Sequence, residues 1–271
     1  MDSFSIDSEN WLVYDYRAPT SESGVTFVFF NALSGTADMW REAIAQPLAD
    51  AGHGWLLYNL RGQEGTGLDP AVTVDLQLIV DDAVALMSHV KPVRPVYVGL
   101  SIGGLFAARV HLDGVPCAGL VFLNTLRKDG PRLDWINAAV ARAAEVGGSA
   151  LLMDMYAPLL FNQEWQAENR SNALADTGYE PIDTTSGAYR LLASGSTASW
   201  DIPWEHLDVP ALVITGKRDH VFYVESDVDE IAARLPLAER LDVENAGHMV
   251  PVERPSILVD ALERFAERCK P

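Results

Sequence analysis

The sequence contains few cysteines, no long apolar run and no basic leader. Its two cysteines, Cys117 and Cys269, lie far apart and at no metal-ligand spacing, which argues against a disulfide framework and against a zinc site. No run approaches the ~18 apolar residues of a membrane-spanning helix. The first residues, "MDSFSIDSENW", lack both the basic segment and the apolar stretch of a signal peptide. We therefore expect a cytoplasmic protein without a membrane partner.

Basic residues are also fewer than acidic ones. The chain has 20 lysines and arginines against 38 aspartates and glutamates, which gives a formal charge of -18. A field of this sign repels phosphate backbones and anionic lipid headgroups. Nucleic acid is thus disfavoured as a partner, and we interpret the acidity as a means of keeping the protein in solution. The sequence leaves open whether copies of the chain form a homo-oligomer.

Several motifs are missing as well. The chain has no HExxH, no Walker-type phosphate loop and no G-x-G-x-x-G, which removes the motif evidence for zinc, nucleoside triphosphate or dinucleotide. No linker rich in Pro, Ser or charge and no repeat at a fixed period divides the 271 residues. A chain of this length is expected to fold as one compact unit with a sizeable core.

What the sequence does contain is a regular alternation of strand-like and helix-like segments. Helical patterns such as "ADMWREAIAQPLADAG" from Ala37 and "VDLQLIVDDAVALMSHV" from Val74 separate several short apolar runs. This alternation predicts an α/β fold with a mostly parallel sheet that is covered by helices on both faces. The six strand-like runs are "VTFVFF" from Val25, "WLLYNL" from Trp55, "PVYVGL" from Pro95, "GLVFLN" from Gly119, "ALVITG" from Ala211 and "ERLDVEN" from Glu239.

Two regions modify this pattern. The first 17 residues alternate like an antiparallel hairpin at one edge of the sheet, which brings the predicted sheet to eight strands. Between residues 127 and 204 the strand signals vanish and helical patterns dominate. We predict a core domain of residues 1–126 and 205–271, and a helical cap at residues 127–204 that is not an independent domain. Such a cap would lie over the ends of the strands, where open α/β sheets bind their ligands.

A candidate nucleophile follows the strand-like run at Pro95. Ser101 stands in "GLSIGG", between that run and the helical pattern "LFAARVHLDG". A strand, a one-residue corner and a helix force the corner residue into a strained conformation that exposes its hydroxyl. Gly99 and Gly103 provide the small neighbours that let the backbone pass closely. We therefore predict that Ser101 is a nucleophile.

A serine hydroxyl needs a base to take its proton. His248 lies in the glycine-containing loop of "RLDVENAGHMVPVERP", after the last strand and before the final helix, and is the predicted base. The other histidines have ordinary helical or turn contexts, or, in the case of His220, adjoin a better candidate. Asp219, just past the strand-like run at Ala211, is predicted to orient His248, and Asp129 is the alternative acid. The order Ser101, Asp219, His248 is the one expected for a triad on such a sheet.

Acyl transfer also needs donors for the oxyanion of the transition state. One predicted donor is the backbone N–H of Ile102, which follows the nucleophile. The second is the backbone N–H of Leu33 in "NALSGTADMW", the loop after the strand-like run at Val25. Because both contributions come from the backbone, neither depends on the identity of the side chain.

These segments together resemble the α/β-hydrolase superfamily, specifically its cap-bearing esterases, enol-lactonases, cofactor-free haloperoxidases and C–C bond hydrolases. The resemblance covers almost the whole chain. It implies the α/β-hydrolase fold with a cap inserted between sheet strands, and serine catalysis. The motifs that carry it are "GLSIGG", "ITGKRDHV", "ENAGHMVPVERP", "NALSG" and "NLRGQEGTG".

Two loops depart from the family pattern. Members usually carry His-Gly where this chain has Asn31 and Ala32, and Asp-x-x-Gly-His-Gly where "NLRGQEGTG" stands. An Asn can replace part of the hydrogen bonding of that His, whereas Ala restricts a backbone that Gly leaves free. The nucleophile also discriminates, since epoxide hydrolases and haloalkane dehalogenases resemble this chain in fold but use an aspartate at the position of Ser101.

The residues and the resemblance predict a serine hydrolase that cleaves a carboxylic ester or lactone through an acyl-enzyme on Ser101. No cofactor or metal is required, and the partner is a small molecule. Aromatic and methionine side chains gather in the predicted cap, which favours a small to medium substrate with an apolar or aromatic portion. The expected pocket residues are Asn31, Ala32, Met153, Tyr156, Phe161, Trp165, Trp204, Phe222 and Met249.

Two other functions stay open. The same triad could cleave a C–C bond next to a ketone or carry out perhydrolysis. A ligand-binding relative could also keep the fold without turnover. The presence of Ser101, Asp219 and His248 together speaks against the second alternative, because a binding protein has no need of all three.

Overall fold

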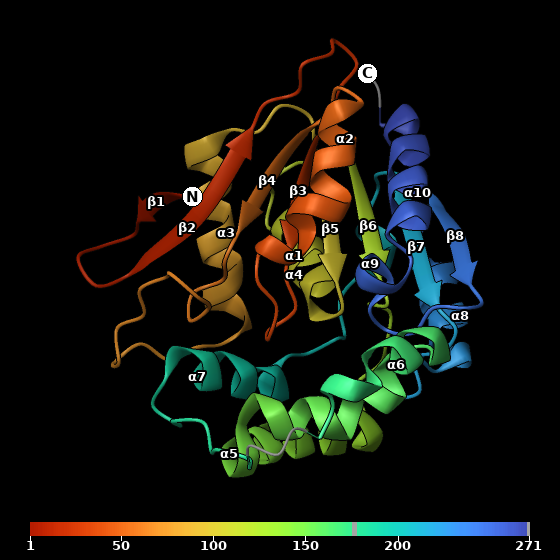
Figure 1. Ribbon diagram of the computed structural model, residues 1–271. Coiled ribbons are helices and arrows are strands. Elements are labelled where there is room, and N and C mark those ends of the chain that lie inside the picture. Colours follow the sequence, from red (N-terminus) through yellow and green to blue (C-terminus); the bar gives the residue numbers. More distant parts are fainter. Residues whose placement is uncertain (175–177, 270–271) are drawn as a thin grey trace.

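The computed structural model describes residues 1–174 and 178–269 and has an eight-stranded sheet at its centre (Figure 1). The strand order is β1-β2-β4-β3-β5-β6-β7-β8, with antiparallel pairing of β1 with β2 and of β2 with β4, and parallel pairing elsewhere. The strands are β1 (Asp2–Ser5), β2 (Trp11–Arg17), β3 (Thr26–Phe30), β4 (Gly54–Tyr58), β5 (Pro95–Leu100), β6 (Gly119–Leu123), β7 (Ala211–Gly216) and β8 (Ala238–Val243).

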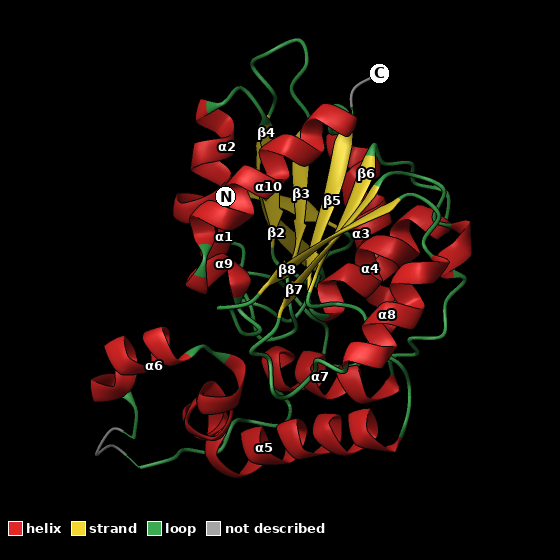
Figure 2. Ribbon diagram, turned by 90° about the vertical axis from the view of Figure 1, so that its right-hand side faces the viewer, coloured by secondary structure: helices red, strands yellow, loops and turns green. Residues whose placement is uncertain are grey.

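Helices cover both faces of the sheet, as the edge-on view in Figure 2 shows. The parallel strands from β3 to β7 are buried on both faces, which is why their sequences are continuous apolar runs and do not alternate, whereas the edge strand β8 is partly exposed and carries charged residues. One face carries α1 (Asp38–Trp40), the π-helix η1 (Arg41–Ala45), α2 (Gln46–Asp50), α9 (Val250–Glu253) and α10 (Pro255–Arg268). The other carries α3 (Leu76–Val90), α4 (Ile102–Leu112) and α8 (Glu225–Arg234).

A group of helices between β6 and β7 lies across the carboxyl ends of the parallel strands (Figures 1 and 2). The long helix α5 bends at Gly148, which has a φ of 65°. A Cβ at that position would lie 2.3 Å from the carbonyl oxygen of Glu180, so a side chain is excluded there. The helices are α5 (Pro131–Leu160), α6 (Gln163–Asn169), η2 (Arg170–Asn172), α7 (Gly187–Ser194) and η3 (Gly195–Thr197), followed by η4 (Trp204–His206).

The observed architecture confirms the predicted fold class. The sheet has eight mostly parallel strands with helices on both faces, and the amino-terminal hairpin forms its antiparallel edge. The predicted division into residues 1–126 with 205–271, and 127–204, stays a prediction, and residues 175–177 and 270–271 of those ranges lie outside the described ones. None of the described helices combines the length and the apolar character that crossing a membrane demands.

Candidate active site

Ser101 occupies a sharp turn between β5 and α4. Its backbone has φ 57° and ψ -124°, a strained conformation for a residue other than glycine. The turn requires close backbone packing, because a Cβ on Gly99 would lie 2.3 Å from the Cα of Gly104, and a Cβ on Gly103 would lie 2.2 Å from the carbonyl oxygen of Phe30. Gly99 is therefore required by the close approach of β5 to α4, and Gly103 by the close approach of α4 to the end of β3.

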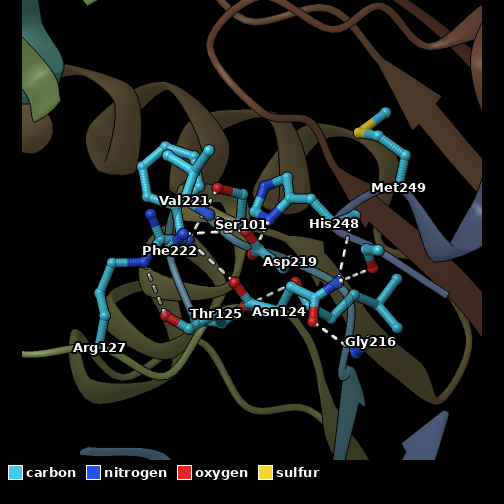
Figure 3. Close-up of polar contacts among 12 residues, drawn as sticks. Ser101, Asn124, Thr125, Arg127, Gly216, Asp219, Val221, Phe222, His248 and Met249 are labelled. Carbon is cyan, nitrogen blue, oxygen red and sulfur yellow. Dashed lines mark hydrogen bonds and ion pairs between the residues drawn. The ribbon is translucent and has the colours of Figure 1, made fainter. Parts of the chain in front are cut away.

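The hydroxyl of Ser101 has an unexpected partner. Its Oγ accepts a hydrogen bond from Arg127 Nη2 at 3.0 Å, and in the described part of the chain it has no hydrogen bond with His248. Ser101 and His248 nevertheless lie next to one another in Figure 3 and line the same cavity. Arg127 follows β6, and its Nη2 and Nε also donate to the carbonyl oxygens of Asn124 (2.8 Å) and Thr125 (3.2 Å).

Asp219 and His248 form a buried pair at the ends of β7 and β8. Asp219 Oδ2 lies 2.6 Å from His248 Nδ1, and its Oδ1 accepts from the backbone N–H groups of Val221 (3.0 Å) and Phe222 (2.9 Å). Burial alone would raise the pKa of Asp219, but the facing His248, the Phe222 N–H and the Arg127 cation together hold this pKa below its ordinary value. An ionised carboxylate only accepts hydrogen bonds, so Nδ1 carries the proton and His248 Nε2 is left as a base.

The loop that carries His248 is held on several sides. The Asn124 amide at the end of β6 donates to the carbonyl oxygens of Gly247 (3.1 Å) and His248 (2.8 Å). The buried Glu253 carboxylate accepts from the Gly247 N–H at 2.9 Å. The backbone N–H of His248 donates to the carbonyl oxygen of Leu160, at the end of α5, at 2.6 Å. These hydrogen bonds from Asn124, Glu253 and Leu160 fix the backbone of the loop and thereby the position of the imidazole.

The end of α5 also contacts the loop that carries Asp219. The backbone N–H of His220 donates to the carbonyl oxygen of Leu159 at 2.9 Å. Beyond the helix, the backbone N–H of Asn162 donates to Glu253 Oε2 at 2.7 Å. The carboxyl-terminal end of α5 is thereby joined to both loops that carry the Asp219–His248 pair.

Two backbone donors are available beside Ser101. Ile102 is the first residue of α4, where an N–H has no partner within the helix, and Leu33 lies in the loop after β3. Among the described residues, neither N–H donates to another group of the chain. Both residues line the cavity together with Ser101. Their amides are thus available to a bound oxyanion.

The loop after β3 is anchored by a buried polar network instead of the His-Gly pair usual in the family. Asn31 Oδ1 accepts from Trp40 Nε1 (2.8 Å), and Asn31 Nδ2 donates to the carbonyl oxygen of Tyr58 (2.8 Å) and to Gln63 Oε1 (3.1 Å). Gln63 Nε2 in turn donates to the carbonyl oxygens of Ala32 (2.9 Å) and Leu33 (3.3 Å). Gln63, from the departing segment "NLRGQEGTG", therefore supports the backbone next to the Leu33 N–H.

A cavity of about 390 Å³ opens between these residues and α5. This volume is typical of a small-molecule site. Its wall is mostly apolar, and the predicted pocket residues Ala32, Met153, Tyr156, Phe161, Phe222 and Met249 are part of it.

Three other residues predicted for the pocket do not line it. Asn31 is fully buried behind the loop in the network with Trp40, because its amide is needed there. Trp165 stacks on Phe161 with a centroid distance of 3.7 Å and is not part of the cavity wall. Trp204 is buried in the core and packs edge-on against Phe122 of β6. These are corrections to the sequence-based expectation, which had no means of telling a cavity wall from the packing behind it.

The alternative acid, Asp129, does not approach His248. Its carboxylate oxygens accept from the backbone N–H of Trp200 (3.0 Å and 3.2 Å) and from Ser199 Oγ (3.2 Å). Asp129 thereby fixes Trp200, a residue that lines the cavity. The acid that contacts His248 is Asp219.

The comparison with known families gives the class of the protein. A sequence model of the alpha/beta hydrolase family matches residues 27–261, which is most of the chain. The chain therefore belongs to the alpha/beta hydrolase family, and the resemblance read from its motifs is confirmed at that level. A search of the curated proteins found no match.

Solved structures share the fold at low sequence identity. MGS-M2, an alpha/beta hydrolase enzyme from a Medee basin deep-sea metagenome library, superposes with a TM-score of 0.81 at 18% identity, covering 97% of this chain and 96% of that chain. A thermophilic esterase from Thermogutta terrifontis gives 0.78 at 20% identity, covering 99% and 97%. The enol-lactonase from Burkholderia xenovorans LB400 gives 0.77 at 20% identity, covering 96% and 98%. At these identities the likeness is one of fold.

Sequence reasoning missed two residues of this site. Arg127 and Asn124 are not among the residues that the sequence predicts for the site. The one available signal was their position within four residues of the end of β6, the same signal that identified Ser101 and Asp219 at other strands. Their partners come from distant parts of the chain, so the contacts themselves leave no local pattern.

Proposed function

We propose that this protein is a serine hydrolase that cleaves a carboxylic ester or lactone of a small to medium, partly apolar substrate. His248 Nε2 takes the proton of the Ser101 hydroxyl as Oγ attacks the carbonyl carbon. Asp219 keeps Nδ1 protonated and stabilises the imidazolium. The Ile102 and Leu33 amides hold the oxyanion. His248 then returns the proton to the leaving alcohol, and an acyl group remains on Ser101.

The second half of the reaction releases the acyl group. Water enters the cavity, gives its proton to His248 Nε2 and attacks the acyl carbonyl carbon, and the proton returns to Ser101 Oγ. Each half needs only the residues named above, together with a small-molecule substrate. We also propose a cytoplasmic location, in keeping with the composition of the chain.

One observation carries the proposal. A strained Ser101 at the amino-terminal end of a helix and His248, whose Nδ1 faces the buried Asp219, line one cavity, beside two backbone N–H groups that have no partner among the described residues. A nucleophile, a base with an orienting acid, and oxyanion donors are the three parts that acyl transfer requires.

The test is intact-mass spectrometry after exposure to a fluorophosphonate. We expect stoichiometric labelling of the native chain and no labelling of Ser101→Ala or His248→Ala. Circular dichroism of all three chains checks that they are folded. A folded native chain that stays unlabelled would contradict an activated serine and favour a ligand-binding function.

The bond that is cleaved needs a second measurement. An aryl ester, a lactone and a β-diketone are offered side by side to the native chain and to Ser101→Ala. We expect turnover of the first two by the native chain. Selective cleavage of the β-diketone would replace the ester assignment by C–C bond hydrolysis with the same residues.

A further inference from the structure

The cavity contains a buried cation that the proposed reaction does not use. Arg127 lines the cavity, is 6% exposed, and contacts Ser101 Oγ through Nη2. Its Nε and Nη2 are bonded to the carbonyl oxygens of Thr125 and Asn124, whereas its Nη1 has no hydrogen bond among the described residues. Figure 3 shows this guanidinium on the side of Ser101 away from Met249.

No anion of the described chain neutralises this charge at contact distance. Asp219 attracts Arg127, but its oxygens are bonded to His248 and to two backbone N–H groups. Asp129, two residues further along the chain, is bonded to the Trp200 backbone. Arg127 has no ion pair in the described residues, in a protein whose formal charge is -18. A buried charge without a counter-ion costs free energy, and a bound anion would offset that cost.

The guanidinium is also held in a fixed orientation. It lies between the rings of Trp200, at 4.6 Å from Cζ to the ring centroid, and Phe222, at 4.3 Å. Burial lowers the pKa of Arg127 to about 10, so the side chain stays protonated at neutral pH. A rigid, charged fork with a free nitrogen suits the two oxygens of a carboxylate.

We propose that Arg127 binds a carboxylate of the substrate, so that the enzyme takes esters or lactones with a carboxylate about three bonds from the scissile carbonyl carbon. This inference rests on the proposed serine hydrolase function. Arg127 Nη2 lies 3.0 Å from Ser101 Oγ, and both groups must reach the same substrate. The carboxylate and the scissile carbonyl carbon must therefore be only a few bonds apart. The apolar wall formed by α5 then receives the rest of the molecule.

Carboxylate binding also changes the state of the nucleophile. The carboxylate accepts from Arg127 Nη2, which withdraws the hydrogen bond that Ser101 Oγ receives in this structure. The Ser101 hydroxyl is then free to turn and donate its proton to His248 Nε2. Substrate binding and activation of the serine are thereby coupled through one guanidinium.

The test compares esters of equal shape that differ in charge. In the first pair, monoethyl succinate has a carboxylate on its acyl side where ethyl isocaproate has an isopropyl group. In the second pair, acetoxyacetate has a carboxylate on its alcohol side where isobutyl acetate has an isopropyl group. For the pair that matches the site, we expect the native kcat/KM for the anionic ester to exceed that for the neutral ester by ~50-fold, the effect of a charged hydrogen bond. The side on which the preference occurs places the carboxylate.

Variants assign the preference to Arg127. In Arg127→Met, which keeps the length and apolar contacts of the side chain, the anionic-to-neutral ratio should fall to about one or below. Arg127→Lys keeps the charge and should retain part of the preference. Arg132→Met removes an exposed cation that acts on Arg127 only through its field, and should keep the native ratio. A circular dichroism spectrum of each variant confirms that it is folded.

The outcomes separate this inference from the proposed function. A native chain that is labelled by the fluorophosphonate but cleaves the neutral members as efficiently would overturn the role of Arg127 and leave the serine hydrolase function intact. A native chain that is not labelled would remove the hydrolase function. In that case, calorimetric binding of monoethyl succinate by the native chain and not by Arg127→Met supports the carboxylate site, and equal weak binding by both overturns it.

Discussion

At the scale of single residues, the site depends on a few buried polar atoms whose partners fix their protonation. Asp219 is 2% exposed and His248 is 4% exposed, so neither exchanges its partner for water. The carboxylate is kept ionised by the groups around it, and the imidazole is kept in one tautomer by the carboxylate. The chemistry proposed for Ser101 therefore depends on the charge of Asp219.

The lowered pKa of Asp219 predicts how stability changes in acid. Because the folded state holds this carboxyl deprotonated below its ordinary pKa, its contribution is fully present above pH ~4 and is lost as the pH falls through the lower folded-state value. Urea unfolding of the native protein and of Asp219→Asn, from neutral pH down to pH ~2, gives the free energy of unfolding of each chain at each pH. The free energy of unfolding of the native protein should approach that of Asp219→Asn as the pH falls below ~4. If the two free energies instead ran parallel with pH, the prediction would be contradicted.

At the scale of elements, the turn after β5 depends on space as well as on sequence. Gly103 lies on α4 with a site for Cβ only 2.2 Å from the Phe30 carbonyl oxygen. Gly103→Ala should lower the free energy of unfolding by about 3 kcal/mol, since backbone atoms must move. Gly114→Ala, at a φ of 88° with nothing within 4 Å of the added Cβ, is the matched control and should cost about 1 kcal/mol. Equal losses in urea unfolding would show that steric contact at Gly103 is unimportant.

The loop after β3 depends on Gln63. Gln63→Ala removes the amide that holds the carbonyl oxygens of Ala32 and Leu33. We expect kcat for an aryl ester to fall by ~10–100-fold with little change in KM, because the Leu33 N–H is needed mainly by the oxyanion. Gln46→Ala changes a half-buried glutamine that is bonded to Asp50, and should keep native values. A change confined to KM would assign Gln63 to substrate binding instead.

The strand and helix patterns were sufficient to predict the elements and the residues that follow them. Ser101, Asp219 and His248 were predicted from their positions in the segments that follow strands, which is a local property of the sequence. The burial of Arg127 was not predictable, because the rings that enclose it come from Trp200 and Phe222, far along the chain. The prediction that Trp204 lines the pocket was wrong for the same reason, because this aromatic residue of the predicted cap packs in the core on Phe122 of β6.

At the scale of the whole molecule, the formal charge of -18 repels an anionic substrate, whereas Arg127 in the cavity attracts it. If Arg127 binds a carboxylate, the surrounding field slows the approach of that substrate at low ionic strength. Raising NaCl from ~10 mM to ~150 mM screens exposed charges but affects the buried contact much less. The kcat/KM for the anionic ester should rise by ~2–5-fold, and that for its neutral counterpart should stay constant. A fall in the kcat/KM for the anionic ester on adding salt would contradict this prediction of long-range repulsion and local attraction.

The bonds between the end of α5 and the loops of Asp219 and His248 have a consequence for engineering. Leu159 and Leu160 supply carbonyl acceptors to those loops, and Asn162 bonds to Glu253 beneath them. The helices over the sheet are thus not an exchangeable module that can be cut out between β6 and β7 and replaced by those of a relative. A chimera that aims at a new specificity would have to retain residues 159–162 and exchange only the helical segments that precede or follow them.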